Sequence, residues 1–215
     1  LLRKHINSGR ILSITQPGLE RIIDFEIQHL DELGDVKVKH LIVELMGKHS
    51  NIIFTDDNNT IIDSIKHVTS VMSSVRQVLP GKPYFIPETM DKANPLEITR
   101  EDFFNIVFSK PMALSKAIYT SFTGISPVTA EEICSLAGMD SSVPAQEYSA
   151  DILLHLYTQF EIYLSAIKED TFSPGIYFDG KEPKEFSALP LSHFVNYTRV
   201  EYDSVSEVLE TYYST

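Results

Sequence analysis

The sequence has no tryptophan, a single cysteine and no long apolar run, and each absence narrows the class of protein. A lone cysteine, Cys134, excludes an internal disulfide and is typical of a reducing compartment. No apolar stretch approaches the roughly 20 residues that a membrane helix needs, and no secretory signal opens the chain. We therefore expect a cytoplasmic protein that does not span a membrane.

Signatures of catalysis and of cofactor binding are also missing. The sequence contains no P-loop, no Rossmann glycine pattern and no nucleophile elbow. Its histidines do not show the paired spacing of a zinc site with a neighbouring carboxylate. The sequence thus predicts a protein that is not an enzyme, with no cofactor and no metal.

The charge that is present lies unevenly along the chain. Over 215 residues the net charge is −12, which argues against a general nucleic-acid binder. Residues 1–80 carry 9 Lys or Arg and 10 Asp or Glu, whereas residues 81–215 carry 9 and 20. Any polyanionic partner is therefore expected to meet the N-terminal part.

Hydrophobic periodicity predicts a β-rich part followed by a helical part. Alternating residues and short turns indicate antiparallel strands at 9–16, 21–30, 36–46, 51–55 and 60–66. In the second of these, Ile23, Phe25 and Ile27 face one way and the acidic or polar residues between them face the other. A Pro-rich stretch, residues 78–98, reads as a linker or an extended wrapping segment.

The period becomes helical from Thr99, which forms a predicted capping box with Asp102. Helices follow to about residue 168, then strands at 175–178, 186–191 and 197–202, and a final helix capped by Asp203. The predicted class is α+β, with three parts: a β-rich part (1–98), a helical part resembling helix-hairpin-helix proteins (99–170), and a small β/α segment (171–215).

The most informative motif is VELMGKHSNIIF, Val43 to Phe54. Gly47 and Asn51 are suited to a turn because both residue types tolerate positive φ. Lys48 and His49 at the tip are not required by the turn, and they indicate a surface that contacts something negative.

Glu44 interrupts the apolar face of the strand at 36–46, where a buried carboxylate is costly unless it is paired. Two interpretations stay open. Glu44, Leu45 and Met46 form a recognition patch at the strand end, or Glu44 is a structural partner of Arg21 or Lys48.

Two further motifs have a functional and a structural interpretation. Arg21, with Glu20 beside it, can hold a phosphate in a bidentate manner, although most such pairs are solvated surface charges. Residues 124–130 resemble the phosphate-binding turn of a helix-hairpin-helix, but Glu131 and Glu132 follow where binding versions usually carry Lys or Arg. A structural helical hairpin is favoured there.

Across its whole length the chain resembles the NFACT family. The resemblance is carried by the Pro17–Arg21 stretch and by the segments LLRKHINSGRI, VELMGKHSNIIF, DSIKHV, VLPGKPY and DSVSEVLETYY. It implies an N-terminal domain distantly similar to that of formamidopyrimidine-DNA glycosylases, here lacking its first segment and their catalytic chemistry. It further implies that 171–215 returns to that domain and that its last helix leads into a coiled coil.

The resemblance also implies partners and site residues. Bacterial members are called fibronectin-binding proteins and act in ribosome-associated quality control, where they bind obstructed large ribosomal subunits and recruit tRNA for C-terminal alanine tailing. The family's tRNA-recognising Asp-Arg pair falls on Glu20 and Arg21, and its Glu-aliphatic-Met patch falls on Glu44, Leu45 and Met46. The alternatives are a fibronectin- or fibrinogen-binding surface adhesin and, by fold analogy alone, a nucleic-acid repair enzyme.

Overall fold

A computed structural model describes residues 1–87 and 92–214. The chain divides into two compact units, Leu1–Asp91 and Lys92–Thr215. The boundary falls inside the Pro-rich segment that was predicted as a linker (78–98), of which residues 88–91 lie outside the described part. The expected three-part division, with 171–215 returning to the first part, stays a prediction.

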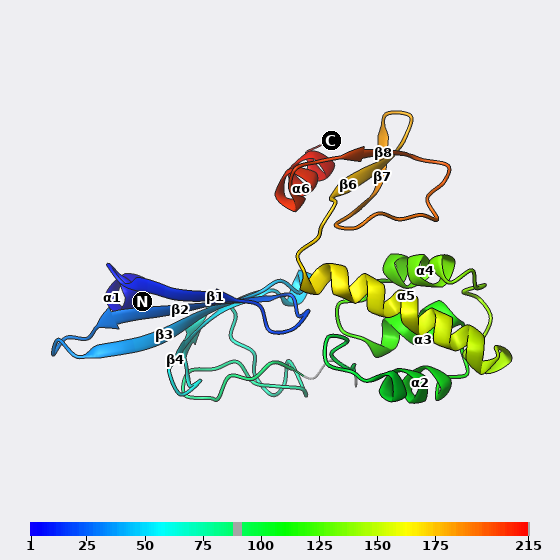
Figure 1. The fold of residues 1–215 in the computed structure, drawn as a ribbon. Coiled ribbons are helices and arrows are strands. Elements are labelled where there is room, and N and C mark those ends of the chain that lie inside the picture. Colours follow the sequence, from blue (N-terminus) through cyan, green and yellow to red (C-terminus); the bar gives the residue numbers. More distant parts are fainter. Residues whose placement is uncertain (88–91, 215) are drawn as a thin grey trace. The chain divides into compact units, whose positions relative to one another are not determined.

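The first unit contains an antiparallel sheet whose five strands pair in sequence order. Figure 1 shows β1 to β4 in blue and cyan, lying side by side. The elements are α1 (Leu2–Ile6), β1 (Arg10–Thr15), β2 (Ile22–Leu30), β3 (Val36–Glu44), η1 (Gly47–His49), β4 (Asn51–Asp56) and β5 (Ile61–Ser64). This arrangement confirms the antiparallel strands that alternation predicted, with bounds shifted by one or two residues at most ends.

The core of this unit lies on the sheet face that carries Ile22. Its buried residues are Ile22, Ile42, Ile53, Ile61 and Val78, and Tyr84 and Ile86 pack against them. Side chains alternate along a strand, so the predicted apolar row of β2 (Ile23, Phe25 and Ile27) lies on the opposite face. The segment after β5 covers the Ile22 face, because it supplies Val78, Tyr84 and Ile86. The opposite face also holds buried side chains, those of Ile27 and Phe54.

The second unit begins with helices around an aromatic cluster. The helices are α2 (Arg100–Phe108), α3 (Leu114–Ser121), α4 (Pro127–Leu136), η2 (Ala145–Glu147) and α5 (Ala150–Lys168). In Figure 1, α5 is the long yellow helix, and it contacts α2 and α4. The predicted capping box of Thr99 and Asp102 is confirmed at the start of α2. The Phe103 ring lies 5.6 Å from the Phe122 ring and 4.7 Å from the Phe160 ring, and all three are fully buried.

A three-stranded sheet and a helix complete the second unit. The strands are β6 (Gly175–Asp179), β7 (Glu182–Ser187) and β8 (Thr198–Glu201), in the order β7-β6-β8, and the helix is α6 (Val205–Tyr213). The prediction of a strand at 186–191 was wrong. Gly180, with φ +60°, makes a tight hairpin, so β7 begins at Glu182. The cap of α6 is Ser204, whose hydroxyl accepts from the backbone N–H of Glu207, and not Asp203. Within the described residues, no helix combines the length and the apolar character needed to cross a membrane.

Candidate nucleic-acid interface

The first candidate residues meet at one end of the five-stranded sheet. The start of β2 pairs with the end of β3, with Ile22 opposite Glu44. One residue further out, the backbone N–H of Leu45 donates to the carbonyl of Arg21 at 2.8 Å. The sheet register therefore places the Glu20-Arg21 pair directly beside the Leu45-Met46 pair, although more than twenty positions separate them in the sequence.

The turn that follows is short and tightly held. Gly47, with φ +57°, opens the single 3₁₀ turn η1, and the backbone N–H of Met46 donates to Ser50 Oγ at 2.9 Å. Lys48 and His49 lie on this turn, and both are exposed. The local structure thus presents both side chains to solvent immediately after the Leu45-Met46 pair.

Asn51 has a different role from the one predicted. It does not adopt positive φ but is buried at the start of β4, where its amide binds the backbone of Lys66. Its Nδ2 donates to the Lys66 carbonyl at 2.9 Å, and its Oδ1 accepts from the Lys66 N–H at 3.0 Å. The Lys66 ammonium then donates to the carbonyl of Lys48 at 3.2 Å. Asn51 therefore brings a further exposed cation, Lys66, to the Lys48 turn.

Four cationic or titratable side chains are exposed at this end of the sheet, namely Arg21, Lys48, His49 and Lys66. Within residues 1–87 and 92–214, none of them forms an ion pair. Lys66 was not among the predicted site residues. The one sequence signal at Lys66 was its place in the DSIKHV motif. Its contact with Lys48 could not be predicted, because β4 and β5 lie between the two residues in the sequence.

The residues of the predicted Glu-Leu-Met patch differ in exposure. Leu45 is 51% exposed, Met46 packs against the buried core, and Glu44 is fully buried. The side chain of Glu44 is therefore not accessible to RNA in this structure. The predicted RNA contact of Glu44 stays a prediction, and the structure gives this residue an internal partner at the strand end.

The partner of Glu44 is Arg76. Neither Arg21 nor Lys48, the two predicted partners, pairs with it. Tyr84 Oη also donates to Glu44 Oε2 at 3.2 Å, and Arg76 Nη1 donates to the Phe85 carbonyl at 2.8 Å. Burial, and next the neighbouring negative charge of Glu44, raises the pKa of the Tyr84 phenol. This buried cluster fixes the segment after β5 to the end of β3, directly before Leu45 and Met46.

The helical hairpin provides no comparable cluster of cations. Gly124 has φ +77°, and Ser126 caps α4 by accepting from the Thr129 N–H at 3.1 Å. Glu132 is 2% exposed and accepts from His193 Nδ1 at 2.6 Å. Burial favours a higher pKa for Glu132, but the hydrogen bonds from His193 and from Ser192 together lower it. Glu132, which follows the turn that resembles a phosphate-binding turn, is thus an internal partner of the loop between β7 and β8.

These features define an α+β protein with a cation-bearing sheet end, and comparison with known proteins gives its family. Residues 1–215 match the family model described as NFACT N-terminal and middle domains, so the chain belongs to the NFACT family. It is 40% identical over 215 residues to the Rqc2 homolog RqcH of Bacillus subtilis (strain 168), covering 99% of this chain and 35% of that protein. The chain therefore spans about a third of the length of this relative.

Relatives also occur outside bacteria and among solved structures. The human ribosome quality control complex subunit NEMF is 28% identical over 146 residues, covering 67% of this chain and 13% of NEMF. The crystal structure of the fibrinogen binding protein from Staphylococcus aureus superposes with a TM-score of 0.79 at 31% identity, covering 100% of this chain and 74% of that one. The homologues place the chain in a family of ribosome quality-control factors.

Proposed function

We propose that this chain is the RNA-recognising part of a ribosome-associated quality-control factor, which brings tRNA to obstructed large ribosomal subunits for alanine tailing of stalled chains. The relatives named for ribosome quality control support the setting. The observation that carries the RNA contact is a set of four exposed side chains at one sheet end, none of which forms an ion pair within the described part of the chain, in a molecule with net charge −12. The ribosome supplies the peptide-transfer chemistry, so this part needs none of its own.

Within this proposal the residues have distinct roles. Arg21 binds a phosphate or a base edge, Glu20 orients it, and Lys48, His49 and Lys66 add phosphate contacts. Glu20 is half-buried, and its backbone carbonyl accepts from Gln16 Nε2 at 2.8 Å, which holds the pair in place. Leu45 presents an apolar surface beside the Arg21 backbone.

The test is tRNA binding by the 215-residue chain, measured by gel shift at two salt concentrations. Arg21→Ala should weaken binding about tenfold, the scale of one lost charged hydrogen bond, and should lower the slope of log K against log salt by about 1. Lys48→Ala and Lys66→Ala should each lower the slope in the same way. Arg100→Ala removes an exposed cation from the second unit and serves as the matched control.

The contact assignment fails if Arg21→Ala and Arg100→Ala behave alike. The wider setting is tested separately, by co-sedimentation of the full-length protein with large ribosomal subunits. If the full-length protein does not co-sediment while Arg21→Ala still weakens tRNA binding, the RNA contact stands and the ribosomal role does not.

A second candidate function is adhesion to fibrinogen or fibronectin, because the superposed Staphylococcus aureus protein is named a fibrinogen binding protein. The acidic residues of 81–215 would then meet basic matrix segments. Binding of the chain to immobilised fibrinogen at physiological salt, unaffected by Arg21→Ala and Lys48→Ala, would favour this function.

A further inference from the structure

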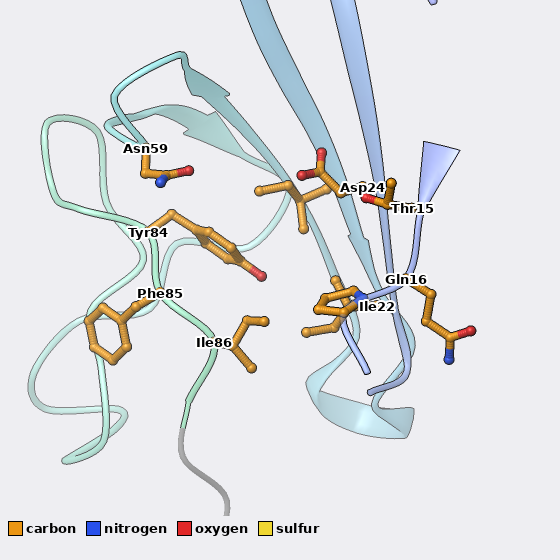
Figure 2. A pocket seen from close by; sticks show the side chains of 10 residues that line it. Thr15, Gln16, Ile22, Asp24, Asn59, Tyr84, Phe85 and Ile86 are labelled. Carbon is orange, nitrogen blue, oxygen red and sulfur yellow. The ribbon is translucent and has the colours of Figure 1, made fainter. Parts of the chain in front are cut away.

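The first unit contains an open hollow of about 350 Å³ on the sheet face that bears Ile22. Figure 2 shows Thr15, Gln16, Ile22 and Asp24 on one side of it and Tyr84, Phe85 and Ile86 on the other. One wall is therefore the sheet and the other is the segment after β5. The volume lies at the lower end of the range of about 300–1,000 Å³ that is typical of small-ligand pockets.

The walls of this hollow are held in place by the same contacts that build the sheet end. The backbone N–H of Tyr84 donates to the Asn59 carbonyl at 2.7 Å, and the Tyr84 hydroxyl donates to the buried Glu44. Asn59 and Tyr84 flank the opening on the side opposite β1 and β2, and this backbone bond fixes them to each other. A ligand would enter a formed site, so little ordering entropy opposes its binding.

Among the described residues that line the hollow, one carries a carboxylate. Asp24 supplies a carboxylate, 28% exposed, and His40 Nδ1 lies 3.0 Å from each of its oxygens. A carboxylate has about four lone-pair sites, so Asp24 can accept further hydrogen bonds.

The charge of the lining excludes an anion and favours a cation. Among the described residues that line the hollow, Asp24 carries the one formal charge, and there is no Lys or Arg. Tyr84 adds an aromatic ring, and Arg76, which covers this ring at 5.6 Å from its centroid, is not part of the lining. The Tyr84 ring lines the hollow, and aromatic rings attract guanidinium groups.

We propose that this hollow binds an arginine side chain from a basic segment of a partner protein. A guanidinium is planar, always charged and has five N–H donors, which suits an acceptor-only carboxylate beside an aromatic ring. An RNA base could also donate to Asp24, but a neutral base lacks the positive charge that would match this carboxylate. This site does not depend on the proposed RNA contact of Arg21.

The test is an NMR titration of the ¹⁵N-labelled 215-residue chain with N-acetyl-arginine methylamide. The amide signals of Thr15, Gln16 and Tyr84 should shift together. N-acetyl-citrulline methylamide has nearly the same shape but a neutral ureido group, so it should bind at least tenfold more weakly. Because this comparison uses the unaltered chain, it does not depend on whether a variant folds.

Two variants locate the site. Asp24→Asn removes the charge but keeps the shape, and it should reduce arginine-amide affinity at least fivefold. Asp57→Asn removes an exposed carboxylate from the turn after β4 and should change nothing. Arg21→Ala, which tests the RNA proposal, should leave this titration unchanged.

Three results would overturn the inference. Equal binding of the arginine and citrulline amides would show that charge is not recognised. Tighter binding of guanosine than of the arginine amide would assign the hollow to a nucleobase. Shifts spread over the acidic residues of the second unit, without those of Thr15, Gln16 and Tyr84, would show non-specific attraction only.

Discussion

The ion pair between Glu44 and Arg76 makes the sharpest prediction about stability. Glu44 is fully buried, and the Arg76 side chain is 11% exposed. Arg76→Met keeps much of the side-chain volume but leaves the Glu44 carboxylate buried without its cation. Removing one partner of a buried pair costs about 3–5 kcal/mol. We expect the lower end of this range, because the Tyr84 hydroxyl still donates to the carboxylate.

The assay is hydrogen exchange followed by mass spectrometry, which reports on the two units separately. A loss of about 3 kcal/mol corresponds to roughly a hundredfold or greater increase in the opening of the first unit. Peptides from β3 and β4 should therefore exchange faster, while peptides from α5, in the second unit, should not change. Lys4→Met is the matched control, because its pair with Glu32 is exposed and such pairs contribute about 0–1 kcal/mol.

The double variant Glu44→Leu with Arg76→Met extends the test. Replacing a buried pair by apolar residues is often neutral, so the double variant should recover most of the protection lost in Arg76→Met. The reasoning is refuted if Arg76→Met has no more effect than Lys4→Met. It is also refuted if the double variant loses as much as the two single variants together.

Three further outcomes are expected. Burial raises the pKa of the Cys134 thiol to about 12, so a thiol reagent at pH 8 should label Cys134 slowly in the native state and quickly in denaturant; equal rates would contradict its burial. The pKa of Glu132 is lowered by its bonds from His193 and Ser192, against the effect of burial, so its contribution to stability is present above the unfolded pKa and is lost as the pH falls through the folded pKa. The Tm difference between the parent and Glu132→Gln should therefore shrink between pH 6 and pH 3, and a constant difference would argue against this linkage. Removing the Ser126 cap of α4 by Ser126→Ala should cost about 1 kcal/mol in calorimetry, whereas Ser135→Ala, at an exposed position of the same helix, should cost less.

The strands and helices were largely predictable because their signals are local. Alternation fixed the strands of the first unit, and the Thr99–Asp102 pair marked the start of α2. The strand predicted at 186–191 was misplaced because the prediction relied on the apolar residues Phe186 and Leu191. The hairpin at Gly180 instead sets the register in which β7 pairs with β6. A turn residue with positive φ fixed the pairing more strongly than the apolar pattern did.

The candidate site was predictable only in part. The motif at 43–54 identified Lys48 and His49 as residues that the turn does not require, and the structure shows both exposed. The partner of Glu44 was missed, because Arg76 lies 32 residues away in a segment without regular periodicity. Contacts of this kind depend on where an irregular segment packs, and no local pattern encodes that.

The sequence by itself determined the α+β class, the order of the strands and the near-neutral charge of residues 1–80 against the acidic remainder. These properties follow from composition and from the spacing of apolar side chains along the sequence. Both can be read without knowing which distant residues meet in the fold. Tertiary structure alone decided that the Ile22 face is covered, that Glu44 is an internal partner of Arg76, and that Lys66 joins Lys48. It also placed Asp24 opposite Tyr84 across a hollow. Each of these depends on residues that approach only after the chain has folded, when burial decides which charges must be paired and which stay exposed.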